Sequence, residues 1–134
     1  MGRRALIAVA LALPLTACGA QATNSASEFE GEQAKVAELV DQLAAAGRAG
    51  DAEKICNEIL AKQLVTELKS AGGDCVKEMD RAIDDASDFD LRVRSVKIAG
   101  DTATAQVRQG DGGTTATFTF VKEGGGWRAS ALGG

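Results

Sequence analysis

Residues 91–107 of the chain are LRVRSVKIAGDTATAQV, and apolar residues alternate with polar ones along most of this segment. Alternation with a period of two predicts β-strands that bury one face. The alternation changes phase between Val93 and Val96, because Arg94 and Ser95 both lie between them. A slip of one residue is typical of a β-bulge, so we expect a bulge or bend at this point.

The alternation continues to residue 132 and is interrupted by three turns rich in glycine. The turns lie at Gly100-Asp101, at residues 110–113 and at residues 124–126. Strands that follow one another through short turns pair as an antiparallel meander. We therefore predict a four-stranded antiparallel sheet with one apolar and one polar face.

Upstream of residue 91 the apolar residues follow helical spacing instead. Start and stop signals divide this part into three predicted helices. These run from a capping box at Ser27–Glu30 to Gly47 and Gly50, from the cap Asp51 through Leu68 to residues 71–73, and from the cap Asp74 to about Ala86. Helices followed by a meander predict an α+β domain, with the N-terminal helices packed on one face of a curved sheet.

Residues 1–18 have the layout of a secretory signal peptide. Arg3 and Arg4 precede an apolar run at residues 5–15, which is shorter than the roughly 20 residues of a membrane-spanning helix. The run ends in Leu15-Thr16-Ala17-Cys18, which resembles the bacterial lipobox. In that family the cysteine thiol receives a diacylglycerol, the preceding peptide is removed, and the cysteine becomes the first residue.

The lipobox resemblance implies a division of the chain and a location. It implies a signal peptide at residues 1–17, a lipidated Cys18 with a flexible tether at residues 18–28, and a folded domain at residues 29–134. It also implies a protein exported across the cytoplasmic membrane and held on the cell envelope by lipid, diacylglycerol and palmitate, on Cys18. The alternative is an ordinary cleaved signal peptide followed by an incidental cysteine.

The chain has 3 cysteines, and assigning Cys18 to lipid leaves Cys56 and Cys75. In an oxidising compartment two remaining cysteines predict a disulfide. Closing a loop of about 20 residues stabilises a domain by roughly 3 kcal/mol in the chain-entropy model. Two buried free thiols are the alternative, and a metal-binding pair is a weaker one because the chain contains no histidine.

The charge balance is acidic. The whole chain has 15 basic and 19 acidic residues, and removing Arg3 and Arg4 with the signal peptide leaves 13 basic and 19 acidic residues. This net charge argues against a nucleic-acid partner and against attraction to anionic lipid through basic residues. It favours a solvated acidic surface.

The acidic run near the third helix does not predict a metal site. The run consists of Asp84, Asp85, Asp88 and Asp90, and it lacks the glycine and the closing glutamate of a calcium-binding loop. We interpret it as a solvated helix end, and we predict no bound metal and no cofactor.

Three segments carry a second resemblance. They are VKIAGDTA at residues 96–103, the alternating threonines and phenylalanines of residues 114–120, and VKEGGGWR at residues 121–128. Together with the helical half they resemble small bacterial lipoproteins of the NTF2-like (SnoaL-like) superfamily. The resemblance implies a curved sheet wrapped around helices into a cone, in some members with a pocket at the open end. Phe118, Phe120 and Trp127 are then candidate pocket-lining residues, and a core anchor is the alternative role of Trp127.

The superfamily includes isomerases, dehydratases and cyclases beside non-catalytic binding modules. Its enzymes rely on an Asp or His base and a Tyr or Asp donor, whereas this chain has no His and no Tyr. Asp90 lies beside the first predicted strand, but Arg92 and Arg94 follow it and would lower its pKa, which disfavours a base near neutral pH. The two arginines could bind an anion, or lie on the solvent face. We predict no catalytic residue.

Three hypotheses about function remain. The first is a non-catalytic envelope lipoprotein that binds a small apolar ligand or an envelope protein. The second is a small enzyme of the isomerase or dehydratase type, and the third is a tethered interaction domain without a pocket. A cavity of roughly 300–1,000 Å³ would separate the first from the third.

Overall fold

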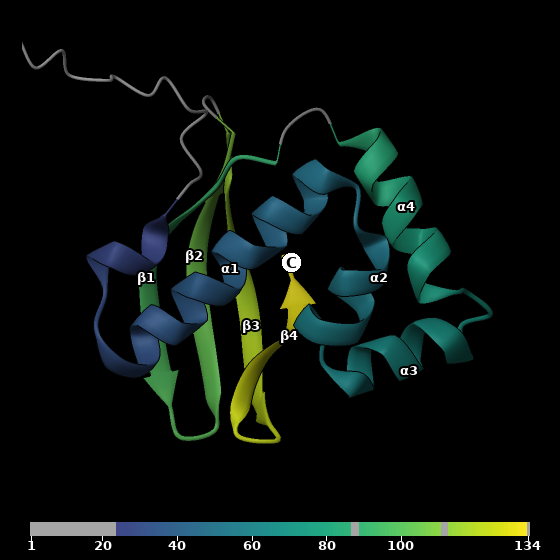
Figure 1. Ribbon diagram of the computed structural model, residues 1–134. Coiled ribbons are helices and arrows are strands. Elements are labelled where there is room, and N and C mark those ends of the chain that lie inside the picture. The colour runs from purple at the N-terminus through teal and green to yellow at the C-terminus, as the bar shows by residue number, and fades with distance from the viewer. Residues whose placement is uncertain (1–23, 87–88, 111–112, 134) are drawn as a thin grey trace, which may run out of the picture.

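The computed structural model describes residues 24–86, 89–110 and 113–133. Helices come first and strands second (Figure 1). The elements are the 3-10 turn η1 (Ser25–Glu28), α1 (Gly31–Ala49), α2 (Ala52–Lys54), the π-helical turn η2 (Ile55–Ile59), α3 (Lys62–Ser70), α4 (Cys75–Asp85), β1 (Leu91–Ala99), β2 (Thr102–Gln109), β3 (Thr115–Glu123) and β4 (Gly126–Leu132).

The four strands form one antiparallel sheet in the order β1-β2-β3-β4, so the predicted α+β class and the meander are confirmed. The predicted bulge is also present, because the register passes from Val93↔Val107 to Ser95↔Gln106 and leaves Arg94 as the extra residue. A further register shift in β4 was not predicted: Thr119 pairs with Ala131 and Phe120 with Ala129.

The hydrophobic core lies between α1 and one face of the sheet. Figure 1 shows α1 crossing that face, with α2, α3 and α4 beyond the β4 edge. The fully buried side chains come from both layers and include Val36 and Val40 on α1 and Val107 and Phe120 on the strands. Burying such side chains stabilises the fold by about 1.5–3 kcal/mol each. We call η1, α1 and the sheet the body of the domain.

Two predictions about α1 need correction. Gly47 does not end the helix. It is buried inside α1, where a Cβ would overlap the ring of Phe89, so glycine makes room for that ring. Gly50 ends the helix with φ of 69°, a conformation that glycine adopts without the strain of a Cβ. The Ser27–Glu30 capping box is absent, because the hydroxyl of Ser27 donates to the carbonyl of Asn24 instead.

Residues 24–28, expected in the flexible tether, belong to the folded body. The carboxylate of Asp41 on α1 accepts hydrogen bonds from the backbone N–H of Ser25 at 3.1 Å and of Ala26 at 3.0 Å. The buried hydroxyl of Ser25 accepts from the N–H of Val93 on β1 at 3.1 Å. These bonds hold η1 against α1 and β1. Because the segment is polar and has no local pattern, the sequence did not predict these contacts.

The second helix was predicted as one continuous element and is instead broken. Asp51 caps its start as expected, accepting from the N–H of Lys54 at 3.0 Å. After η2 the chain becomes extended at Leu60 and Ala61, because the N–H of Ala61 donates to the carbonyl of Ala129 on β4 at 2.8 Å. A hydrogen bond to the sheet edge thus interrupts the helix at Leu60 and Ala61, and α3 begins only at Lys62.

The last two helices form a peripheral pair, which we call the α3–α4 arm, residues 62–85. Gly72-Gly73 separates the helices as predicted, and Asp74 caps α4 by accepting from the N–H of Lys77 at 3.1 Å. Every residue of both helices is described, and none of them is buried. Over the described ranges, no helix is long and apolar enough to cross a bilayer.

Candidate functional site

A groove with a volume of about 510 Å³ lies between α3 and the β3–β4 hairpin, along the β4 edge of the sheet. This volume falls within the roughly 300–1,000 Å³ of small-molecule sites. The groove is lined by Cys56, Asn57, Leu60, Lys62, Val65, Thr66, Glu123, Gly124 and Arg128. The break at Leu60-Ala61 creates it, because α3 leaves the body there at a new angle.

The groove combines an apolar wall with a polar rim. Leu60 is 2% exposed and lies beneath the surface of the groove, whereas Val65, half-buried on the first turns of α3, presents an accessible apolar side chain. A side chain at the boundary of core and solvent offers a ligand an apolar surface that costs little to dehydrate. The wall therefore suits an apolar portion of a small molecule.

Glu123 closes one end of the groove and caps α3. Its two carboxylate oxygens accept from the backbone N–H of Lys62, the first residue of α3, at 3.1 and 3.2 Å. A carboxylate at a helix N-terminus is favoured by the unpaired N–H groups and the helix dipole. This contact attaches the arm to the sheet across 61 residues of sequence.

Two cations border the groove. Arg128 on β4 donates from Nη1 to the carbonyl of Asn57 at 3.0 Å, which leaves further N–H groups of its guanidinium for other acceptors. The side chain of Lys62 extends from an exposed position at the start of α3. The rim thus carries two cations and one carboxylate, and the N–H groups of Lys62 and Arg128 can donate to an anionic group.

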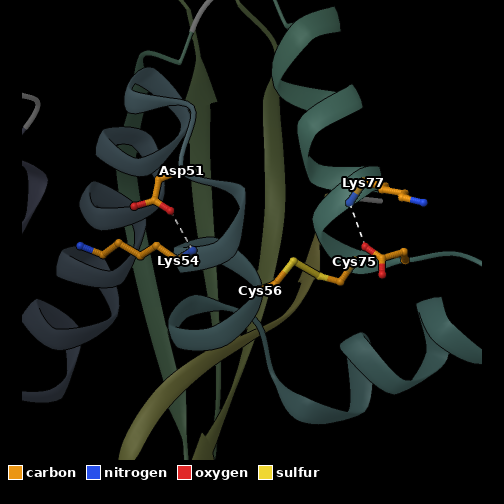
Figure 2. The surroundings of a disulfide bond; sticks show 6 residues. Asp51, Lys54, Cys56, Cys75 and Lys77 are labelled. Carbon is orange, nitrogen blue, oxygen red and sulfur yellow. Dashed lines mark hydrogen bonds between the residues drawn. A yellow bond between two sulfur atoms is a disulfide. The ribbon is translucent and has the colours of Figure 1, made fainter.

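The predicted disulfide is confirmed and stands at this groove. Cys56 of η2 and Cys75, the first residue of α4, are joined with their Cα atoms 6.1 Å apart, within the usual range of about 4.4–6.8 Å. Figure 2 shows the bridge running from the helical turn of Cys56 to the start of α4, between the capped turns at Asp51 and Lys77. Because Cys56 also lines the groove, the covalent link fixes the arm beside it.

The three candidate pocket-lining residues lie in the core instead. Phe118, Phe120 and Trp127 are 2%, 1% and 6% exposed and belong to the cluster between α1 and the sheet. Trp127 has a polar partner, because its indole N–H donates to Glu32 on α1 at 2.7 Å. Trp127 therefore serves as the core anchor that was its alternative role.

Glu32 collects three donors where α1 meets the β3–β4 hairpin. Lys35 donates at 2.9 Å, Trp127 at 2.7 Å, and the ammonium of Lys122 lies 3.3 Å away and 5.3 Å from the centre of the indole ring. The hydrogen bond from Lys35, followed by that from Trp127, lowers the pKa of Glu32 from 4.5 to about 2. The side chain is 37% exposed, so this cluster is a solvated link between layers.

Asp90 and its neighbouring arginines lie at the other end of the sheet. Asp90, Arg92, Arg108 and Gly110 line a cavity of about 200 Å³, and Arg92 and Arg108 face each other across β1 and β2. Arg92 and Arg94 are exposed, as expected for the solvent face of β1. This cavity is too small for most ligands.

The sequence did not predict four of the charged residues described above: Lys62, Glu123, Arg128 and Glu32. Glu32 and Trp127 are 95 residues apart in the sequence. No local sequence pattern predicts the hydrogen bond between them. Cys18 and the predicted signal peptide lie outside the described residues. Among the residues that the structure describes, no group of three or more His, Cys, Asp or Glu could hold a metal ion.

Comparison with known proteins adds no relative: no protein-family model, no curated protein and no solved structure matches this chain.

Proposed function

We propose that this chain is a non-catalytic lipoprotein of the bacterial cell envelope, anchored through Cys18, with an NTF2-like domain that binds a small ligand. The observation that carries the binding role is the groove at the β4 edge, whose volume and mixed lining suit a small molecule. The NTF2-like assignment is supported by helices that precede a bulged antiparallel sheet and by one long helix on its inner face.

The ligand that best fits the groove is a small amphipathic anion. Val65 offers an accessible apolar side chain, while Lys62 and Arg128 give the lining two cations against the one carboxylate of Glu123. A few placed polar groups fix a ligand's orientation, and apolar contact supplies much of the affinity. Because of Lys62 and Arg128, we expect a ligand with an anionic group rather than a purely apolar one.

Native mass spectrometry of the mature protein, purified gently from the producing cells, tests the groove. Thr66→Trp places a large side chain on an exposed lining position of α3, whereas Ser70→Trp on the same helix lies outside the lining and is the matched control. We expect a bound small molecule on wild type and on Ser70→Trp, and its loss from Thr66→Trp. Equal occupancy in both variants, or no ligand on wild type, would contradict the groove as a binding site.

The lipid anchor rests on the sequence of residues 3–18 and needs its own test. We expect Cys18→Ala to abolish incorporation of a labelled fatty acid and to leave the precursor uncleaved at this site. Labelling that persists in Cys18→Ala would refute the anchor, whatever the outcome for the groove.

A further inference from the structure

Charge is distributed unevenly between the two halves of the domain. Residues 24–90 contain 16 acidic and 7 basic residues, whereas residues 91–133 contain 3 acidic and 6 basic residues. The net charge of the chain is therefore the sum of a basic sheet and a more strongly acidic helical half. Because electrostatic attraction depends on the charges nearest a surface, net charge alone does not decide what this protein can approach.

The basic residues of the sheet gather on its outer face. The helices cover the inner face (Figure 1). On the outer face Arg92, Arg94 and Lys97 on β1 and Arg108 on β2 are exposed. The bulge contributes to this arrangement, since Arg94 is the extra residue that it inserts into β1. We call these four residues the basic face. Two carboxylates border it: Asp90 shares a cavity with Arg92 and Arg108, and Glu28 shares another with Arg92.

The neutral part of this face is polar. Thr104, Gln106, Thr117 and Thr119 occupy central outward positions of β2 and β3, and Val121 is an apolar residue near the end of β3 on the same face. The fully buried centres of protein interfaces are enriched in aromatic residues and methionine, and these outward positions carry neither. An array of threonines and arginines is better suited to a charged, hydrated surface than to a protein partner.

The start of the described chain lies beside the basic face. Asn24, the first described residue, lines a small cavity together with Arg92. The chain between residues 18 and 24 spans at most about 20 Å, at roughly 3.5 Å per residue. A lipid on Cys18 would therefore hold the β1 edge of the domain close to the bilayer, within a short distance of its phosphates.

We propose that the basic face docks on the anionic phospholipid headgroups of the membrane that carries the lipid anchor. Each basic residue near an anionic membrane surface strengthens binding by about fivefold, and the acidic helices are repelled by the same surface. The domain then lies with its sheet on the membrane and its helices away from it. The inference rests on the proposed anchor for its location, but the affinity of the face for anionic lipid is independent of lipidation.

Vesicle co-sedimentation of residues 19–134 tests this affinity without the anchor. This fragment contains every residue of the hydrophobic core, so it keeps what folds the domain. The probes are vesicles of phosphatidylcholine alone and of phosphatidylcholine mixed with phosphatidylglycerol. We expect binding to the mixed vesicles only, and weaker binding at higher salt because exposed charges are screened.

A pair of charge-matched variants makes the test specific for the face. The face variant is Arg92→Gln, Arg94→Gln and Lys97→Gln, and the control is Lys54→Gln, Lys69→Gln and Lys77→Gln on the exposed helical side. Both lose three positive charges. We expect the face variant to bind about 100-fold more weakly, from about fivefold per residue, and the control to bind like wild type.

Three outcomes would overturn the proposal: no preference of wild type for the mixed vesicles, equal losses in the two variants, or self-association of wild type that the face variant abolishes while vesicle binding is unchanged. The last outcome would assign the face to the acidic helices of a second copy. Because all changed side chains are exposed, circular dichroism should show a native fold for both, and single Lys97→Gln serves if the triple variant does not fold. Failure here leaves the Cys18 labelling and the groove untouched.

Discussion

The body and the α3–α4 arm are held in place by different means. The body packs α1 on the sheet through side chains such as Val36, Val107 and Phe120 that are nearly inaccessible to solvent. The arm contains no buried residue in either helix. It touches the core only through half-buried side chains such as Val65 and Met79, and it is attached by the Cys56–Cys75 disulfide and by the Glu123 cap of α3. Segments with few buried apolar contacts open locally at a lower free energy than the core does, so we expect the arm to open before the body.

This difference assigns different roles to the two walls of the groove. The wall made by Leu60 and β4 belongs to the core and is rigid, while the wall made by α3 belongs to the arm. For the proposed ligand site, we expect the α3 wall to be the one that adjusts to ligand size. The disulfide limits how far the adjustable wall moves, since Cys75 begins α4 at the arm's attachment to η2.

The largest expected loss of stability comes from removing a large buried side chain from the body. Phe120→Ala should lower the free energy of unfolding by about 3–5 kcal/mol, a large share of the 5–15 kcal/mol of a typical domain. Leu68→Ala on the arm is the comparison; because Leu68 is only half-buried, we expect a loss under about 1 kcal/mol. Urea unfolding followed by circular dichroism measures both. Similar losses at the two positions would show that the arm is part of the core.

The second effect comes from cutting the disulfide. The double variant Cys56→Ser/Cys75→Ser removes a link worth roughly 3 kcal/mol in the chain-entropy model, so we expect the melting temperature to fall by more than about 8 °C. Hydrogen exchange should show lost protection in residues 62–85 and retained protection in α1 and the strands. An equal loss of protection in the arm and the body would show that the two regions do not unfold separately. Free-thiol titration of the unfolded mature protein, expected to find none once Cys18 is lipidated, confirms the starting state.

The sheet could be predicted from sequence because its determinants are local. Alternation places Ala103, Ala105 and Val107 on one face, glycines mark the turns, and even the bulge at Arg94 leaves a phase change in the pattern. The disulfide was predictable because only two cysteines remained after Cys18. Such features need no knowledge of which segments meet in space.

The groove could not be predicted, because distant contacts create it. Helical spacing continues from Ile59 to Leu64 in the sequence. The helix is interrupted there by contacts with distant residues, the bond from Ala61 to Ala129 and the Glu123 cap on Lys62. Aromatic residues line many ligand sites, but a chain with 4% aromatic residues uses them where they bury the most surface. Trp127 thus fills the core and the groove is lined by other residues.

The smallest effect comes from a charged link at the surface of the body. Glu32 joins α1 to the β3–β4 hairpin through Trp127 and Lys122, and exposed ion pairs contribute little where apolar packing already holds two layers. Glu32→Gln keeps an oxygen that can accept from the indole but removes the charge. We expect the melting temperature at neutral pH to fall by about 1–3 °C, far less than for Phe120→Ala.

The pH dependence distinguishes this link from a packing effect. The pKa of Glu32 is lowered to about 2 in the folded protein from 4.5, so the unfolded chain takes up its proton first as pH falls. The stabilisation by the carboxylate is therefore complete above pH 4.5, decreases between about pH 4.5 and 2, and is lost below that range. Melting curves of wild type and Glu32→Gln should differ most at neutral pH and converge near pH 2. If the difference between them stays constant down to that pH, the loss in Glu32→Gln arises from altered packing of Trp127, and the two layers of the body depend on that contact rather than on charge.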